Sequence, residues 1–450
     1  MSIEQIASFI VVLGVLIFVH ELGHFLMAKR AGVGVLKFSL GFGPKLLGVK
    51  RGETEYLLSA LPLGGYVKMI GEDPGDTSPE ATDPERSFSQ KRVGIRALII
   101  LAGPLTNLLL PILLFSGINM TVGQDYVVPV LGRPDANSPA AEAGLEPRDR
   151  ILAVDGKPVT RWEEVELPVR MSTGEPVVLT VQREGRTFDV RLTPRKSRLF
   201  DPLGQEHEVW DVGLHPLIPA QVARVEPGLP ARAAGVQAGD VIAAIDGTPV
   251  VEWEEMSRII RSRPGQPIVL SVLRHGQPLE IRMTASRETE KEATGESREI
   301  GKIGIASAGP EVARERLGPF RAIAAGVEET AQTSLLLVQG VWKIIQGRIS
   351  PRTIGGPIMI AQVTGEVAQR GLRQLIKWTA LLSINLAILN LLPIPILDGG
   401  HLMFSLVEWL RGKPVSLRKR EIAQQVGFVL LVGLMIFAFY NDIFRLLGRP

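Results

Sequence analysis

The chain has 450 residues, of which 45% are hydrophobic and 22% are charged. This length exceeds what one hydrophobic core requires, and the mixture of apolar and charged residues predicts membrane spans combined with soluble domains. The formal net charge of +3 argues against a nucleic-acid partner, and the absence of cysteine excludes disulfides and cysteine-ligated zinc.

The first membrane-length apolar segment covers residues 6–27 and contains an H-E-x-x-H motif at residues 20–24. On a helix, His20 and His24 lie on one face, so their imidazoles can share a metal ion. Glu21 lies beside them, where it can deprotonate a metal-activated water. Ionisable groups are costly in lipid and usually mark a functional site there. The motif therefore favours an intramembrane metalloprotease over a chance match in an ordinary membrane anchor.

Three further segments, residues 97–118, 378–397 and 426–440, are long and apolar enough to cross a bilayer. Lys and Arg are concentrated in residues 28–96 and 411–420, which are therefore expected on the cytoplasmic side, with both termini outside. Basic residues just before the third span oppose this orientation. The sequence predicts a polytopic α-helical membrane protein with four transmembrane helices.

The region between spans two and three contains an internal repeat. Trp162-Glu163-Glu164 recurs 91 residues later as Trp253-Glu254-Glu255, and Asp155-Gly156 recurs at the same offset as Asp246-Gly247. A constant offset indicates two copies of one domain, in which short strands alternate with Gly and Pro turns and a helix follows each Trp-Glu-Glu. The charged stretch 286–298 is expected to be a solvated loop inside the second copy.

Two histidines leave a tetrahedral zinc ion one protein ligand short, with the fourth position kept for water. Asp398 directly follows a stretch of span three that is broken by Pro393 and Pro395. Open backbone survives at membrane depth only where protein or a water-filled cavity meets it, so Asp398 is the preferred third ligand. His401 is the rival ligand, or else a donor to the site or an interfacial residue. The structural alternative for Asp398 is a helix cap at the membrane surface.

The H-E-x-G-H motif of span one, together with N-x-x-P-x-P-x-x-D-G at residues 390–399, resembles the site-2 protease family of intramembrane zinc proteases. The two repeat copies resemble PDZ domains of the bacterial protease-associated type, an arrangement similar to the sigma-E-regulating members of that family. Other agreeing stretches are Gly41-Phe42-Gly43-Pro44, Gly103-Pro104-Leu105-Thr106-Asn107 and Gly355-Gly356-Pro357-Ile358.

The resemblance implies one zinc ion per chain, bound by His20, His24 and Asp398, with Glu21 as the catalytic base. It implies that Asn390 steadies the substrate backbone or the developing oxyanion, whereas the alternative for Asn390 is a helix–helix hydrogen bond. It also implies a membrane-associated β-structure whose edge binds the unwound substrate. The residues expected at that edge are Gly64, Gly65, Tyr66, Val67, Lys68 and Met69.

The organisation that follows is span one (1–30), a cytoplasmic-side loop with the β-structure (31–96) and span two (97–120). The PDZ-like domains (125–217 and 218–308) and a periplasmic-side amphipathic linker (309–374) come next. Span three (375–402), a cytoplasmic loop (403–423) and span four (424–446) complete the chain.

The expected function is cleavage of single-span membrane proteins in the bacterial inner membrane, near its cytoplasmic side. The implied substrates are an anti-sigma factor already trimmed by a first protease and remnant signal peptides. The PDZ-like domains would lie in the periplasm and exclude bulky ectodomains, bind a peptide or tail, or act only as spacers. A proteolytically inactive membrane adaptor and a metal transporter stay open as other classes; the intact Glu21 opposes the first, and the scarcity of polar residues in the spans opposes the second.

Overall fold

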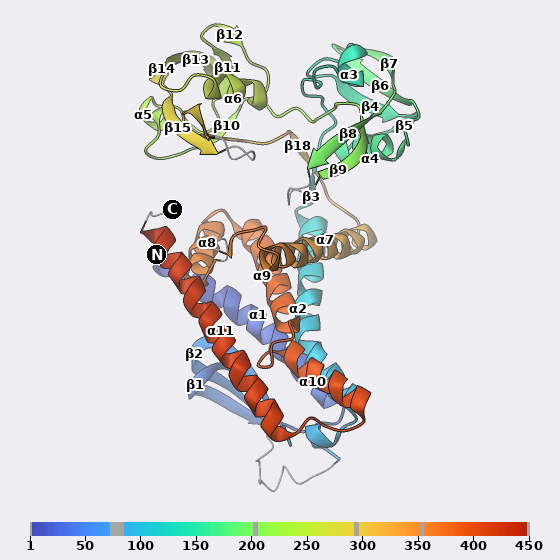
Figure 1. Cartoon of the computed structure of the whole chain (residues 1–450), viewed down its shortest axis with the longest axis vertical. Helices are drawn as coiled ribbons and strands as arrows, with labels where there is room; N and C mark the ends of the chain where they lie inside the picture. The colour runs from blue at the N-terminus through green and yellow to red at the C-terminus, as the bar shows by residue number, and fades with distance from the viewer. Residues whose placement is uncertain (1, 73–84, 201–205, 292–296, 352–354, 448–450) are drawn as a thin grey trace. The chain divides into compact units, whose positions relative to one another are not determined.

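The computed structural model describes residues 2–72, 85–200, 206–291, 297–351 and 355–447. It divides into a helical unit, made of Met1–Gly123 and Arg316–Pro450, and a β-rich unit, Gln124–Glu315 (Figure 1). The predicted insertion of a β-rich region between two pairs of apolar helices is confirmed by this division.

Among the described residues, four helices of the helical unit are long and apolar enough to cross a membrane. They are α1 (Ile3–Arg30), α2 (Val93–Thr121), α9 (Leu372–Leu391) and α11 (Leu417–Leu446). Each predicted span falls on one of them. The predicted third span, 378–397, extends beyond the C-terminal end of α9. The helix ends at Leu391, because Leu392 precedes Pro393 and adopts extended backbone.

The helices α1 and α2 pack closely where the H-E-x-x-H motif lies. A Cβ atom on Gly23 would stand only 2.3 Å from the carbonyl oxygen of Ala102, so the absence of a side chain lets the helices approach. The hydroxyl of Thr106 donates a hydrogen bond of 3.0 Å to the carbonyl oxygen of Val19 across this contact. The position of the motif relative to α2 is therefore fixed by direct backbone contact.

The remaining elements of the helical unit are a sheet and shorter helices. Strands β1 (Val35–Arg51) and β2 (Thr54–Met69) are antiparallel and fold back on themselves, so that Phe38 pairs with both Tyr56 and Val67. The helices are the 3-10 helix η2 (Phe88–Gln90), α7 (Pro319–Ile345), α8 (Pro357–Gln369) and α10 (Asp398–Arg411). The carboxylate of Asp442, on α11, accepts hydrogen bonds from the backbone N–H groups of Gly356, Ile358 and Met359 and so caps α8.

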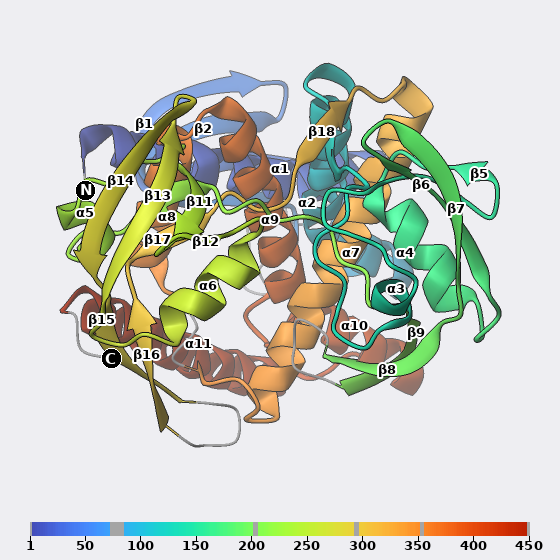
Figure 2. The ribbon, with the colours of Figure 1, turned by 90° about the horizontal axis from the view of Figure 1, so that it is seen from above.

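The β-rich unit contains the same fold twice. The sheet orders are β5-β4-β6-β7 and β12-β11-β13-β14, and the helix of each copy begins at the Trp of Trp-Glu-Glu (Figure 2). The first copy contains α3 (Pro139–Glu142), β4 (Arg150–Val154), β5 (Lys157–Pro158), α4 (Trp162–Met171), β6 (Val177–Arg183), β7 (Arg186–Leu192), β8 (Arg195–Phe200) and β9 (Glu206–Asp211). The second contains β10 (Val222–Val225), α5 (Pro230–Ala233), β11 (Val241–Ile245), β12 (Thr248–Pro249), α6 (Trp253–Arg261), β13 (Pro267–Arg274), β14 (Gln277–Thr284), β15 (Ser286–Lys291), β16 (Ser297–Lys302) and β17 (Ile305–Ser307). Strands β3 (Gln124–Val127) and β18 (Val312–Glu315) pair where the chain enters and leaves the unit.

The repeat extends to an ion pair between a buried aspartate and a partly exposed arginine. Arg183 donates to both carboxylate oxygens of Asp149 at 2.7 Å, and Arg274 donates to both oxygens of Asp240 at 2.8 Å. The two arginines lie at the ends of equivalent strands, β6 and β13. The predicted duplication of one domain is thereby confirmed down to its polar contacts.

The expectation of a loop at 286–298 is wrong. Strands β15 and β16 form an antiparallel hairpin over most of this stretch, with residues 292–296 outside the described residues. The hairpin places Glu290 opposite Arg298, and Lys302 forms an ion pair of 2.9 Å with Glu288. A ribbon whose charged side chains pair across the strands has a composition close to that of a solvated loop, which explains the error.

Candidate metal centre

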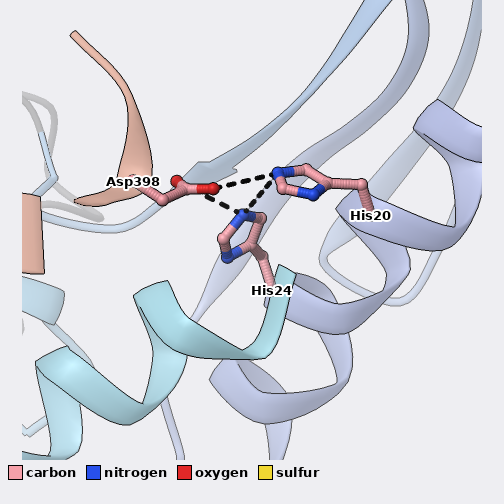
Figure 3. Close-up of side chains that lie close together, drawn as sticks. All are labelled: His20, His24 and Asp398. Carbon is pink, nitrogen blue, oxygen red and sulfur yellow. Dashed lines mark hydrogen bonds and ion pairs between the residues drawn. The ribbon is translucent and has the colours of Figure 1, made fainter. Parts of the chain in front are cut away.

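Three side chains from opposite ends of the sequence converge in the helical unit. Nε2 of His20 lies 3.1 Å from one carboxylate oxygen of Asp398, and Nε2 of His24 lies 3.6 Å from the other (Figure 3). The two imidazole Nε2 atoms are 3.2 Å apart. All the candidate ligand atoms lie within 4.8 Å of one another, so one ion could contact all three side chains.

The helical geometry of α1 places the two histidines side by side, because residues four apart lie one turn apart on the same face of a helix. Both residues are buried, with 8% and 9% of their surface exposed, although most of α1 is apolar. The close approach of α2 leaves no spare room beside them: a Cβ atom on Gly103 would lie 2.2 Å from Nε2 of His24.

Asp398 owes its position to the break between α9 and α10. The chain leaves α9 at Leu391, passes the two prolines and re-enters a helix with Asp398 as the first residue of α10. A carboxylate is favoured in the first turn of a helix. Gly399 and Gly400 pack closely against the segment that links α9 to α10. A Cβ atom on Gly399 would lie 2.3 Å from the carbonyl oxygen of Leu391, and one on Gly400 would lie 2.3 Å from that of Ile394.

The donor set fits a zinc ion. Two imidazole nitrogens and one carboxylate are typical protein ligands of catalytic zinc, which keeps its remaining position for water or substrate. Nδ1 of His24 lies 2.9 Å from the carbonyl oxygen of Ile99, and a carbonyl can only accept, so Nδ1 carries the proton. The lone pair of this ring is therefore on Nε2, directed at the point where the three side chains meet.

The predicted base and the predicted substrate edge lie side by side. A Cβ atom on Gly65 would be 2.9 Å from Cγ of Glu21. The final segment of β2 pairs with β1 on one side, Gly65 opposite Leu40 and Met69 opposite Val35, and within the described ranges no other strand pairs with it. Tyr66 stacks on Phe42 with ring centroids 6.3 Å apart. Gly64, Val67 and Lys68 belong to the same segment.

Two other candidates lie nearby in the chain. Asn390 is half-buried near the C-terminal end of α9, one residue before the helix ends. His401 lies in α10, one turn beyond Asp398, where its ring packs edge-on against Phe404 at 6.4 Å. The group of potential ligands found among the described residues contains Asp398 and does not contain His401.

The sequence interpretation gave no role to Asn107 or Ile99, both on α2, although both contact the histidines. The available signal was the presence of a polar Asn107 in an apolar span, where polar residues usually contact neighbouring helices. The carbonyl of Ile99 has no sequence signal, because every residue has one.

The family model for Peptidase family M50 matches residues 8–434. The Regulator of sigma-E protease RseP of Escherichia coli K12 is 38% identical over 456 residues, covering 98% of this chain and 99% of that protein. A protein of Neisseria meningitidis serogroup A that carries the name of a zinc metalloprotease is 36% identical over 459 residues, covering 99% of this chain and 100% of that protein. The solved PDZ domain of the SdrC-like protein of Listeria innocua is 23% identical, covers 22% of this chain and 99% of that domain, and has a TM-score of 0.16. That score is too low to assign the fold of either β-rich copy.

Apolar helices that bring such a donor set together are the framework of a membrane-embedded metallopeptidase. Both the family model and the relatives cover nearly the whole chain, and the family model extends from α1 into α11. The chain belongs to peptidase family M50, and it is a zinc metalloprotease.

Proposed function

We propose that the chain is an intramembrane endopeptidase of the site-2 type, which hydrolyses a peptide bond within the transmembrane segment of single-span membrane proteins. The observation that supports this most strongly is the convergence of His20 and His24, which lie beside Glu21 on a helix of membrane-spanning length, with Asp398, which follows another such helix. These three side chains would bind one zinc ion per chain. The ion would supply Lewis-acid chemistry, which makes water acidic enough to ionise near neutral pH.

The protein residues around the metal have separate tasks. Glu21 takes a proton from the attacking water and later delivers it to the leaving amine. Asn390, at the end of α9, donates a hydrogen bond to the substrate backbone or to the developing oxyanion. His20 and His24 would each bind the ion through the lone pair on Nε2 of a neutral imidazole.

The edge of β2 would bind the substrate. A transmembrane helix satisfies its own amide groups, so it must unwind before a peptide bond becomes accessible. The segment from Gly64 through Met69 can accept an extended chain by strand addition, because β1 is the only strand that pairs with it among the described residues. Gly65 would hold that chain next to Glu21, since the two residues are in contact.

The relatives and the charge distribution support a substrate class and a location. Four similar proteins are named as regulators of sigma-E, which supports a trimmed anti-sigma factor as the substrate; remnant signal peptides are proposed as a further class. Lys and Arg concentrated in residues 28–96 and 411–420 support an inner-membrane protein with its site near the cytoplasm. The β-rich copies, as PDZ-like domains, would then lie in the periplasm and control which substrates reach the site.

The test is cleavage of a tagged single-span substrate without an ectodomain, using purified wild type, Glu21→Gln and Asp398→Asn in liposomes. Wild type should cut and should lose activity with a zinc chelator. Glu21→Gln should bind zinc without cutting, whereas Asp398→Asn should lose both. Equal cutting by wild type and Glu21→Gln would refute the mechanism, and zinc binding without cutting by any protein would favour a membrane adaptor.

A further inference from the structure

Asn107 is a fully buried polar side chain of α2 that contacts the metal centre. Its Nδ2 atom lies 3.3 Å from Nδ1 of His20, the ring nitrogen that points away from Asp398. Its other polar atom, Oδ1, is buried and has no hydrogen-bond partner among the described residues. A buried amide oxygen without a partner is energetically unfavourable, so this arrangement needs an explanation.

The chemistry of His20 supplies the explanation. A neutral imidazole that binds a metal through Nε2 carries its proton on Nδ1, and this proton needs an acceptor. His24 meets that requirement through the carbonyl of Ile99. His20 faces Asn107 instead, and an amide NH2 group can only donate.

A half-turn of the Asn107 amide supplies both the acceptor that Nδ1–H needs and the partner that Oδ1 lacks, and it moves the NH2 group to the position that Oδ1 occupied. The oxygen and nitrogen of an amide have nearly the same shape, so exchanging their positions changes no packing. The turn brings Oδ1 to the Nδ1–H of His20 and gives the buried oxygen its partner. We propose that Asn107 is a positioning residue of the metal centre, whose Oδ1 accepts a hydrogen bond from the Nδ1–H of His20 and thereby holds Nε2 in position for zinc.

The backbone of α2 holds Asn107 in place for this task. Proline has no N–H, so Pro111 leaves the carbonyl of the residue four before it, Asn107, without its helical hydrogen bond. The hydroxyl of Ser383, on α9, donates to that carbonyl at 2.7 Å, and both residues are fully buried. Asn107 is therefore fixed to the helix that precedes Asp398 and contacts the helix that carries His20.

This inference rests on the proposed function, because it assumes that His20 binds zinc. It adds a residue from a second helix to a site that the H-E-x-x-H motif alone would confine to α1. It also treats the two histidines as differently supported: a backbone carbonyl orients His24, whereas a replaceable side chain orients His20. His20 is consequently the ligand whose orientation depends on one mutable position.

The experiment measures the zinc dissociation constant of purified full-length protein by competition with a chelator. Asn107→Leu and Asn107→Ala should bind zinc about 10 to 100 times more weakly, the usual cost of removing a partner of a ligating histidine. Asn107→Asp keeps an acceptor and should stay within about threefold of wild type, because a carboxylate is a common partner of metal-bound histidine. Asn119→Leu is the matched control, since Asn119 is also a buried residue of α2 and lies about 18 Å further along the helix.

The outcomes separate this inference from the proposed function. If His20→Ala retains wild-type zinc affinity, the ligand assignment itself fails. If His20→Ala loses zinc while Asn107→Ala binds it like wild type, only the role of Asn107 fails. Equal losses in Asn107→Asp and Asn107→Ala, or an equal loss in Asn119→Leu, would show that buried amide packing matters and not the acceptor, and would also overturn the inference. Should Asn107→Leu not fold, Asn107→Ala and Asn107→Asp still decide the question.

Discussion

Gly65 and Glu21 are in contact across the boundary between β2 and α1. A Cβ atom at residue 65 would stand 2.9 Å from Cγ of Glu21, so the strand can approach the proposed base only as glycine. The contact links two sequence features of different kinds, a metalloprotease motif and a strand edge. It also determines how close an extended chain paired with that edge could come to the carboxylate.

Gly65→Ala is expected to displace Glu21 or the strand and to lower kcat/KM about 100-fold, the order of loss that a misplacement of about 1 Å can cause. Zinc content should not change, because the three atoms nearest to a Cβ at residue 65 belong to Glu21, Ile17 and Ser39, none of which is a proposed ligand. Gly14→Ala on α1 is the control, since a Cβ atom there meets no atom within 4 Å. The measurement is cleavage rate alongside zinc content. Full activity of Gly65→Ala would contradict the proposed geometry.

Gly103→Ala is expected to remove zinc. The added Cβ atom would lie 2.2 Å from Nε2 of His24 and 2.9 Å from Cε1 of His20, so at least one ligand must move. Zinc per chain, measured by atomic absorption after purification, should fall by more than about tenfold. Gly117→Ala, on the same helix with open space around it, should retain zinc. A zinc-replete Gly103→Ala protein would argue against the assignment of the two histidines.

The Asp240–Arg274 pair predicts pH-dependent stability in the second β-rich copy. The hydrogen bonds from Arg274 hold the pKa of the Asp240 carboxyl below its ordinary value of 3.8. Because the folded-state pKa is the lower one, the stabilisation is fully present above about pH 4 and is lost as the pH falls through the folded-state pKa. Asp240→Asn should therefore reduce the free energy of unfolding by about 1.5–3 kcal/mol at pH 7 and by less at pH 3.

Denaturant unfolding of the full chain, followed by tryptophan fluorescence at both pH values, measures this difference. Glu280→Gln is the control, because Glu280 is exposed and its ion pair with Arg282 spans 3.9 Å. Its stability should differ from wild type by no more than about 0.5 kcal/mol. A deficit in Asp240→Asn that is as large at pH 3 as at pH 7 would show that the carboxylate charge is not the source.

Asp442→Ala is expected to loosen the start of α8. The carboxylate accepts three backbone N–H groups there at 2.9–3.0 Å and is fully buried, so its loss leaves those donors without partners. We expect a loss of about 1–2 kcal/mol, visible as a lower Tm in detergent. Asp442→Asn retains one acceptor oxygen and should lose less. An unchanged Tm in both variants would mean that solvent replaces the cap without cost.

The sequence was sufficient where one segment determines the result. Hydropathy located the four apolar helices, a constant offset revealed the repeated domain, and helical spacing placed His20 beside His24. It was insufficient where distant segments meet. The contact of Asn107 with His20 depends on how α1 and α2 pack, and the hairpin of β15 and β16 depends on pairing between charged residues.

The proposed ligands are unevenly distributed along the chain: His20 and His24 lie near one end and Asp398 lies near the other. During synthesis, the first span therefore enters the membrane with only two of the three ligands. The zinc site would become complete only after both β-rich copies have been made and the helix that precedes Asp398 has been inserted. Such an enzyme could not hydrolyse a peptide bond before the segment that carries its third ligand has been inserted.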